Sequence, residues 1–356
     1  MRVNTLLEQT PPLTALDLFC GAGGLTLGLK QAGFKVLVGV ELASTAAETY
    51  RKNHPEVICL EEDIRNICPL ELMSKLGLKK GGLSLLAGCP PCQGFSTLRT
   101  RKKSLSVRDI RNELLFEYLR FVDAFRPRAL MMENVPALKL DERMTIFLSK
   151  LEEMGYLITD ESVRIENAAN YGVPQRRNRM IMQLTKREAL PMVLPSGKTT
   201  VRMAFEKAEL KPVGMSGDYL HDNQSQHGVR VMDIIRAIPK DGGGRDSLPS
   251  NLVLNCHKKS PAGFKDVYGR MKWDDVAPTM TGGCGNPSKG RFLHPEENRA
   301  ISLREAAILQ TFPKNYWFSN KGGRTAIALM IGNALPPEFI RRHAVAIASA
   351  LTKGAI

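Results

Sequence analysis

From residue 15 to residue 184, short apolar runs alternate with segments in which apolar residues recur at helical spacing. The apolar runs occupy residues 15–19, 36–40, 57–60, 83–87, 129–132, 156–159 and 180–184. The segments of helical period include residues 25–31, 44–52, 112–125 and 143–154. Short strands separated by helices of this length require right-handed crossovers. The alternation therefore predicts an α/β fold with a doubly wound, mostly parallel sheet.

The composition and the apolar periodicity of the sequence change after Pro195. Residues 196–296 are rich in Gly and Pro and contain few long periodic runs, which predicts a second, smaller and irregular domain. Basic residues are interspersed through this region, and they include Arg230, Arg245, Lys258, Lys259, Arg270, Lys289 and Arg291. Helical periodicity returns at residues 302–310 and 337–351, and we expect these helices to rejoin the first domain.

Composition narrows the class of protein. A chain of 356 residues, 43% hydrophobic and 24% charged, is expected to bury a sizeable core. Its N-terminus lacks the apolar stretch of a signal peptide, and no run reaches the roughly 18 apolar residues of a membrane span. We therefore expect an intracellular, cytoplasmic protein with no membrane partner. The seven cysteines are an odd number in a large chain and are expected to be reduced.

The charge balance points towards a polyanion. Lys and Arg number 50 against 36 Asp and Glu, which gives a net charge of +14. Basic side chains set against phosphates release condensed counterions, so a surplus of this size favours a nucleic-acid partner. On charge alone, an enzyme that is merely basic is an equal alternative.

A glycine-rich turn follows the first predicted strand. The strand leads into Cys20-Gly21-Ala22-Gly23-Gly24 and then into a helix, a combination that lets backbone approach a ligand closely. Glu41 ends the second predicted strand and Asp63 follows the third. Carboxylates at these positions can accept hydrogen bonds from ribose hydroxyls. The pattern predicts a nucleoside-containing cofactor, and it leaves open whether that cofactor is a dinucleotide.

A cysteine-containing loop follows the fourth predicted strand. Residues 88–96 read Gly-Cys-Pro-Pro-Cys-Gln-Gly-Phe-Ser and place Cys89 and Cys92 at the edge of the sheet where ligands bind. A cysteine there suits nucleophilic chemistry. A redox pair and simple packing remain alternatives. Zinc is not predicted, because a second cysteine pair and histidines at ligand spacing are missing from the sequence.

Glu133 reaches the same edge of the sheet. It follows the apolar run at residues 129–132 and begins the sequence Glu-Asn-Val-Pro. A carboxylate that closes a buried strand in a doubly wound sheet is a candidate for a polar contact with substrate. An ordinary solvated carboxylate is the alternative.

Six segments taken in order resemble the motif series of the cytosine-5 DNA methyltransferases. They are DLFCGAGG at 17–24, GCPPCQGFS at 88–96, ENVP at 133–136, YGVPQRRNR at 171–179, RAISLREAAILQTFP at 299–313 and IGNALPP at 331–337. The resemblance covers both ends of the chain and leaves only the irregular region unmatched. It implies the class I S-adenosylmethionine methyltransferase fold and makes dehydrogenase and redox functions remote.

The resemblance also implies a cofactor and the residues that hold it. The cofactor is S-adenosylmethionine, which leaves as S-adenosylhomocysteine, and no metal takes part. Carried over by position, the cofactor-binding residues are Phe19, Gly21, Gly23 and Leu25 for the methionine part, Glu41 for the ribose, Asp63 and Ile64 for the adenine, and Asn333 at the C-terminal side of the pocket.

The implied reaction is methyl transfer to carbon 5 of a cytosine that is swung out of duplex DNA. Cys92 matches the family nucleophile, which adds to carbon 6 of the base, and Cys89 does not match it. Glu133 matches the carboxylate that holds ring nitrogen 3 and the exocyclic amine. Arg177 and Arg179 match the arginines that orient this carboxylate and bind the carbonyl oxygen of the base.

Two positions depart from the family pattern. Cys89 stands where a second small Gly is frequent, and Leu42 stands where a larger apolar residue commonly stacks on adenine. Neither position is expected to touch the reacting atoms. The departures therefore bear on cofactor affinity and leave the predicted reaction unchanged.

Residues 1–195 plus 297–356 correspond to the catalytic domain and residues 196–296 to the target-recognition domain. The expected partner is double-stranded DNA, bound by a bacterial monomer that works at the nucleoid, with a cognate restriction endonuclease acting separately. A transfer RNA cytosine-5 methyltransferase and a non-catalytic DNA-binding regulator are the alternatives. The size of the recognition region favours DNA over transfer RNA. The presence of Cys92, Glu133, Arg177 and Asn333 argues against a regulator.

Overall fold

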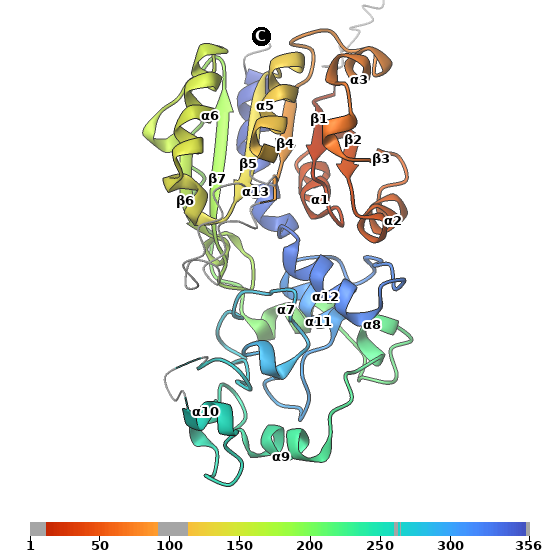
Figure 1. Cartoon of the computed structure of the whole chain (residues 1–356), viewed down its shortest axis with the longest axis vertical. Helices are drawn as coiled ribbons and strands as arrows, with labels where there is room; N and C mark the ends of the chain where they lie inside the picture. Colours follow the sequence, from red (N-terminus) through yellow and green to blue (C-terminus); the bar gives the residue numbers. More distant parts are fainter. Residues whose placement is uncertain (1–11, 92–112, 260–262, 264, 354–356) are drawn as a thin grey trace, which may run out of the picture.

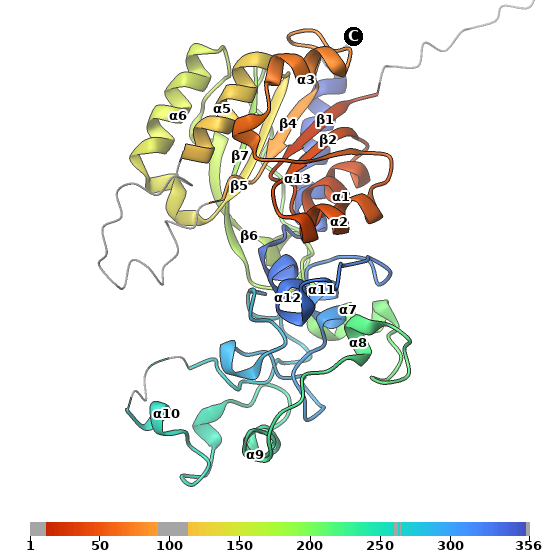
Figure 2. The ribbon, with the colours of Figure 1, turned by 45° about the vertical axis from the view of Figure 1, so that its right-hand side comes forward.

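The computed structural model describes residues 12–91, 113–259, 263 and 265–353. These residues form two lobes, one above the other in Figure 1 and again in the turned view of Figure 2. We name the described residues up to 200, together with 334–353, the sheet lobe. Described residues between 201 and 333 form the second lobe.

A seven-stranded sheet organises the sheet lobe, in the order β3-β2-β1-β4-β5-β7-β6. Its strands are β1 (Thr14–Leu18), β2 (Lys35–Glu41), β3 (Ile58–Glu61), β4 (Leu85–Gly88), β5 (Ala129–Asn134), β6 (Val163–Asn167) and β7 (Asn178–Thr185). Strands β1 to β5 are parallel, whereas β7 runs antiparallel to β5, and β6 antiparallel to β7. The predicted doubly wound, mostly parallel sheet is confirmed.

Helices cover both faces of this sheet. They are α1 (Gly24–Gln31), α2 (Ser44–Asn53), α3 (Pro69–Lys75), α5 (Leu114–Phe125), α6 (Glu142–Glu153) and α13 (Pro337–Lys353). Alternate strand residues point to opposite faces. Leu130 and Met132 therefore join a core with α3, α5 and α6, while Ala129 and Met131 join another with α1, α2 and α13. None of the helices in the described chain is long and apolar enough to cross a membrane.

The second lobe consists of short helices joined by long irregular segments, packed around a separate hydrophobic cluster. Its helices are α7 (Val201–Ala208), α8 (Tyr219–Asp222), α9 (Val229–Ala237), α10 (Asn255–Lys259), α11 (Leu303–Leu309) and α12 (Gly323–Asn333). Helix α11 packs against α7, α8 and α12, whereas α13 returns to the sheet lobe and packs on α1. Residues on both sides of position 296 thus share one core. The functional division at residues 196 and 296 stays a prediction.

The predicted strand at residues 156–159 is wrong. Tyr156 is buried, and its hydroxyl donates to the carbonyl oxygen of Pro127 at 2.7 Å, so the apolar run serves packing after α6. A capping box between Thr159 and Ser162 then turns the chain into β6. This strand lies at the edge of the sheet and carries Arg164 and Glu166 among its apolar residues. A charged edge strand gives a weak apolar signal.

A buried polar network connects α13 to β6 and β7. Glu166 accepts from Nε of Arg164 at 2.7 Å, and its Oε2 lies 3.0 Å from Nε2 of the buried His343 on α13. The main chain of His343 also accepts from the Gln183 side chain at 3.0 Å. Although burial opposes ionisation, the bonds from His343 and Arg164 lower the pKa of Glu166 to about 2. The ionised carboxylate therefore stabilises the folded state.

Replacing this carboxylate should give a pH-dependent loss of stability. Because the folded pKa lies below the usual value, the stabilisation is complete above about pH 4.5 and is lost as the pH falls towards 2. Glu166→Gln should lower the free energy of unfolding by about 2–3 kcal/mol at pH 7. The gap to the unsubstituted protein should narrow as the pH falls below about 4.5 and should close near pH 2, as measured by urea unfolding across pH.

Glu152→Gln on the exposed face of α6 is the matched control and should change the unfolding free energy by less than about 0.5 kcal/mol. A constant difference between Glu166→Gln and the unsubstituted protein from pH 7 to pH 3 would contradict the electrostatic account.

Candidate active site

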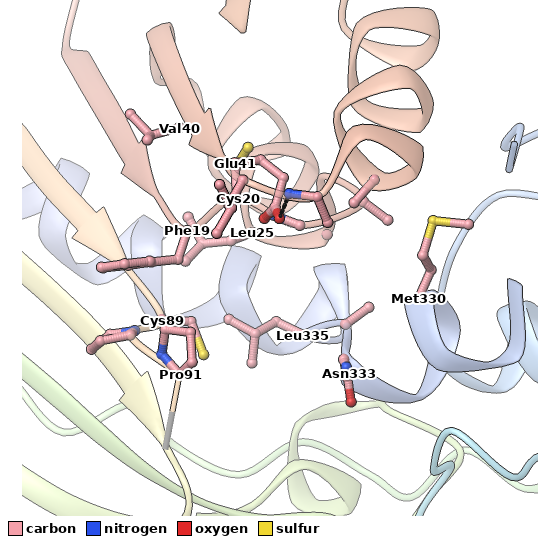
Figure 3. Close-up of a pocket in the computed structure, with 18 of the residues that line it drawn as sticks. Phe19, Cys20, Leu25, Val40, Glu41, Cys89, Pro91, Met330, Asn333 and Leu335 are labelled. Carbon is pink, nitrogen blue, oxygen red and sulfur yellow. Dashed lines mark hydrogen bonds between the residues drawn. The ribbon is translucent and has the colours of Figure 1, made fainter. Parts of the chain in front are cut away.

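A cavity of about 710 Å³ lies at the carboxyl edge of the sheet. Its walls come from the segments that follow β1 to β5, from the start of β7 and from the end of α12. Figure 3 shows Phe19 and Glu41 from the strand side, with Cys89 and Pro91 below them and Asn333 and Met330 to the right. Ligand sites of doubly wound sheets are expected at this edge. The volume suits a nucleoside-sized ligand.

The glycine turn and Glu41 form one unit of the wall. The main-chain N–H of Gly21 donates to Oε2 of Glu41 at 2.9 Å, the dashed line in Figure 3, and that of Ala43 donates to Oε1 at 2.7 Å. Gly21 has a φ of +55°, and a Cβ on Gly24 would lie 2.4 Å from the carbonyl oxygen of Leu335. Burial raises the pKa of Glu41, while these N–H groups oppose that rise. Each carboxylate oxygen keeps acceptor capacity for a ligand hydroxyl.

A second end of the cavity lies beyond β3. Asp63 caps a short 3₁₀ helix by accepting from the N–H of Arg65 at 3.0 Å, and its pKa is lowered by the hydrogen bond from the Arg65 side chain. Ile64 is buried beside it. Leu42, 66% exposed, and Leu329, 51% exposed, also line the cavity. Exposed aliphatic side chains at a cavity mouth suit the flat face of a base.

The structure brings most of the predicted site residues to this cavity. The residues that line it are Phe19, Gly21, Leu25, Glu41, Asp63, Ile64, Glu133, Arg177, Arg179 and Asn333. Gly23 is not among the lining residues and packs behind the turn instead. Cys92 lies outside the described residues.

Glu133 is held from two sides. It is 2% exposed, and its Oε1 lies 2.7 Å from Nε of Arg179, while the Cys89 thiol donates to its Oε2 at 3.0 Å. The sheet explains the first contact: Glu133 pairs in register with Ile181, so Arg179 lies two residues away on the same face. Cys89 follows β4, the parallel neighbour of β5. The carboxylate is therefore oriented before any base binds.

Arg177 fills a different place from Arg179. Its Nη1 donates to the carbonyl oxygen of Met280 at 2.8 Å, and its Nη2 donates to those of Gly332 at 2.9 Å and Ala334 at 3.2 Å. Burial, followed by the nearby Arg179 charge, lowers the pKa of Arg177 to about 9. The guanidinium stays charged at neutral pH and ties the start of β7 to the second lobe and to both neighbours of Asn333.

Gln175 extends this joint between the lobes. Its side-chain oxygen accepts from the N–H of Met280 at 2.9 Å, and its Nε2 donates to the carbonyl oxygen of Leu309 at 3.0 Å and to the Gln310 side chain at 2.6 Å. Both glutamines are fully buried. Buried amides need such complete pairing, because an unpaired one costs about 1–3 kcal/mol. The segment QRRNR at residues 175–179 therefore connects the two lobes in addition to lining the cavity.

Several wall residues escaped sequence reasoning. Arg65 lies two residues after Asp63, so proximity could have suggested it. Leu329 and Met330 lie on α12, whose sequence is apolar over several consecutive residues and shows no amphipathic stripe. Cys89 contacts Glu133, although the sequence offered it only as a loop cysteine at the edge of the sheet and as a departure from a family pattern. The sequence places both residues at the same edge, and the contact itself comes from the structure.

The chain matches the family described as C-5 cytosine-specific DNA methylase over residues 13–349. It belongs to this family. The protein is therefore a DNA (cytosine-5) methyltransferase, and methyltransferases of this family use S-adenosylmethionine.

Curated relatives of the methyltransferase agree with this family. It is 34% identical to the Type II methylase M.HgiDII of Herpetosiphon aurantiacus, over 90% of this chain and 91% of the relative. It is 32% identical to the Type II methyltransferase M.PspPI of a Psychrobacter strain, over 98% of this chain and 80% of the relative.

Solved structures share the fold of the methyltransferase. A DNA modification methyltransferase encoded within an Escherichia coli prophage superposes with a TM-score of 0.67 at 24% identity, covering 96% of this chain and 99% of that one. The Dnmt2 methyltransferase of S. pombe superposes with a TM-score of 0.61 at 17% identity, covering 95% and 99% of the two chains.

The structure also divides the basic residues of the second lobe. Arg270 is fully buried, and its guanidinium donates to the carbonyl oxygens of Ile235 at 2.9 Å and His294 at 3.0 Å, so its charge serves the fold. Of the basic residues singled out from the sequence, Arg230, Lys258, Lys259 and Lys289 are exposed. In the described chain, no group of three or more His, Cys, Asp or Glu side chains is placed to hold a metal ion.

Arg177→Lys should break the joint between the lobes. A lysine keeps the charge but lacks the planar fork that reaches three carbonyl oxygens. We expect the free energy of unfolding to fall by about 2–4 kcal/mol, as measured by chemical denaturation.

Arg176→Lys is the matched control, since the neighbouring side chain is 56% exposed and pairs with Asp275 at the surface. It should change the unfolding free energy by less than about 0.5 kcal/mol. Equal effects of the two substitutions would contradict the role given to Arg177.

Proposed function

We propose that the cavity binds S-adenosylmethionine beside a flipped-out cytosine and that Cys92 is the nucleophile of the reaction. One observation carries the proposal: a single cavity joins the glycine turn and Glu41 to the Glu133–Arg179 pair. A cofactor and a base that share this cavity would be in contact. Proximity of this kind converts a bimolecular step into an effectively unimolecular one.

The wall residues divide between the parts of the cofactor. Phe19, Gly21 and Leu25 face its methionine part, and Glu41 accepts from the ribose hydroxyls. Asp63 and Ile64 hold the adenine, with Leu42 and Arg65 beside them, and Asn333 closes the pocket from α12. Gly23 acts from behind the turn. When bound, S-adenosylmethionine supplies an electrophilic methyl group and leaves as S-adenosylhomocysteine.

The base-side residues prepare the cytosine ring. The Cys92 thiolate adds to carbon 6, which makes carbon 5 nucleophilic. Glu133 accepts from the exocyclic amine and holds a proton at ring nitrogen 3, where negative charge would otherwise develop. Arg179 orients Glu133 through Nε, and we assign its Nη2 to the carbonyl oxygen of the base. Loss of the proton from carbon 5 then allows Cys92 to leave.

Double-stranded DNA is the proposed substrate, with residues 196–296 as the target-recognition region. Side chains presented in the major groove distinguish all four base pairs. The exposed cations Arg230, Lys258, Lys259 and Lys289 support contact of this region with the phosphate backbone. The relatives are named a Type II methylase and a Type II methyltransferase. These names support a function of this protein alongside a restriction endonuclease.

Paired cysteine substitutions test the assignment of the nucleophile. Cys92→Ser should abolish methyl transfer, because serine at neutral pH is a far weaker nucleophile than a thiolate, while S-adenosylmethionine still binds. Cys89→Ser should remain close to the unsubstituted enzyme, since a hydroxyl can still donate to Glu133. Cys89→Ala removes that donor and should lower kcat about threefold to tenfold.

The activity of all three variants is measured as transfer of a labelled methyl group to DNA. Their binding of S-adenosylmethionine is measured by calorimetry. Complete loss of activity in a folded Cys89→Ser variant would reopen the redox-pair interpretation of the two cysteines.

A further inference from the structure

The carbonyl of Ala22, at the back of the glycine turn, is held by a side chain from far along the chain. The Tyr316 hydroxyl donates to this oxygen at 2.6 Å. Tyr316 is buried, and its ring packs with Phe312 and Phe318 in the core of the second lobe. The second lobe thus contacts the glycine turn through a side chain that does not line the cavity.

Gly23 shows how closely this side is packed. A Cβ there would lie 2.5 Å from Nε2 of His54 and 2.6 Å from the Tyr316 hydroxyl, and its φ of +94° also favours glycine. Gly23 therefore leaves room for His54 and Tyr316. This explains why the motif needs a glycine at a position that does not line the cavity.

The hydrogen bonds behind the turn run in one direction. Nζ of Lys30 lies 3.4 Å from Nδ1 of His54, and Nε2 of His54 lies 3.0 Å from the Tyr316 hydroxyl. A lysine ammonium only donates, so Nδ1 accepts and the proton of the neutral ring is on Nε2. Nε2 then donates to Tyr316, which leaves the hydroxyl proton for Ala22. Lys30 itself pairs with Glu56 at the surface.

The electrostatics keep His54 in this neutral form. The ring is 1% exposed. Burial, followed by the nearby Lys30 charge, lowers the pKa of His54 to about 4. A protonated ring would direct an Nδ1–H at the ammonium, so the short distance between Nζ of Lys30 and Nδ1 of His54 favours the neutral ring with its proton on Nε2.

We propose that Lys30, His54 and Tyr316 form a positioning relay that holds the Cys20–Gly24 turn in its cofactor-binding shape. The inference rests on the proposed S-adenosylmethionine site and extends it to residues that lie outside the cavity. Because the N–H of Gly21 faces Glu41 on one side and the carbonyl of Ala22 faces Tyr316 on the other, the turn is fixed from both sides. Tyr316 and His54 act through the turn and have no contact role in the reaction.

Tyr316→Phe removes one hydroxyl and tests the relay. The dissociation constant and KM for S-adenosylmethionine should rise about fivefold to tenfold, while kcat at saturating cofactor stays within about twofold, since the turn can still be driven into shape by excess ligand. His54→Leu should raise the KM in the same way, and His54→Gln, which keeps a donor, should restore part of the affinity. The double variant should be no weaker than Tyr316→Phe alone.

Tyr156→Phe is the matched control. Its hydroxyl also donates to a backbone carbonyl, that of Pro127 at 2.7 Å, and its side chain is equally buried but lies away from the cavity. It should lose similar stability and leave cofactor affinity unchanged.

A change of less than twofold in affinity for Tyr316→Phe, or a fall in kcat with unchanged affinity, would overturn the relay. Glu41→Ala separates this outcome from failure of the site itself. If the Glu41 variant binds S-adenosylmethionine as tightly as the unsubstituted enzyme, the cavity assignment is wrong.

Discussion

A buried guanidinium loses its hydrogen bonds to water and needs acceptor oxygens within the protein. Arg177 donates to the main-chain carbonyl oxygens of Met280, Gly332 and Ala334. The carbonyls of Gly332 and Ala334 flank Asn333, and that of Met280 lies elsewhere in the second lobe. The buried charge therefore fixes where the end of α12 lies against the sheet. Without that placement the cavity would lack its C-terminal wall.

The same edge of the sheet brings together groups from strands that are distant in sequence. Parallel β1, β2, β4 and β5 end side by side, so the glycine turn, Glu41, Cys89 and Glu133 meet without any contribution from loop flexibility. The antiparallel β7 supplies Arg179 to the face that carries Glu133. The antiparallel β7 thus adds a cation to a carboxylate that Cys89, after the parallel neighbour β4, already contacts.

The sequence predicts placement well where it depends on the ends of strands, while the chemical roles of the residues there stay predictions. The turn at Gly21 and the carboxylates at Glu41 and Glu133 end predicted strands, and parallel strands bring such ends to one edge. Prediction from the sequence failed where long-range packing decides. The strand carrying Glu166 is a charged edge strand, and the apolar run at residues 156–159 packs as a connection. The contact of His54 with Tyr316 joins residues 262 positions apart, and neither side chain shows a motif of its own.

In the proposed reaction, Cys92 bonds to carbon 6 of a cytosine in DNA and leaves only after the proton on carbon 5 is removed. Fluorine at carbon 5 cannot leave as a cation, so a duplex with 5-fluorocytosine at the target should stay bonded to the enzyme once methylated. We expect an adduct that requires S-adenosylmethionine, survives a denaturing gel and maps to Cys92 by mass spectrometry of the digested protein. An adduct on RNA alone, an adduct at another residue, or no adduct with an otherwise active enzyme would contradict the account.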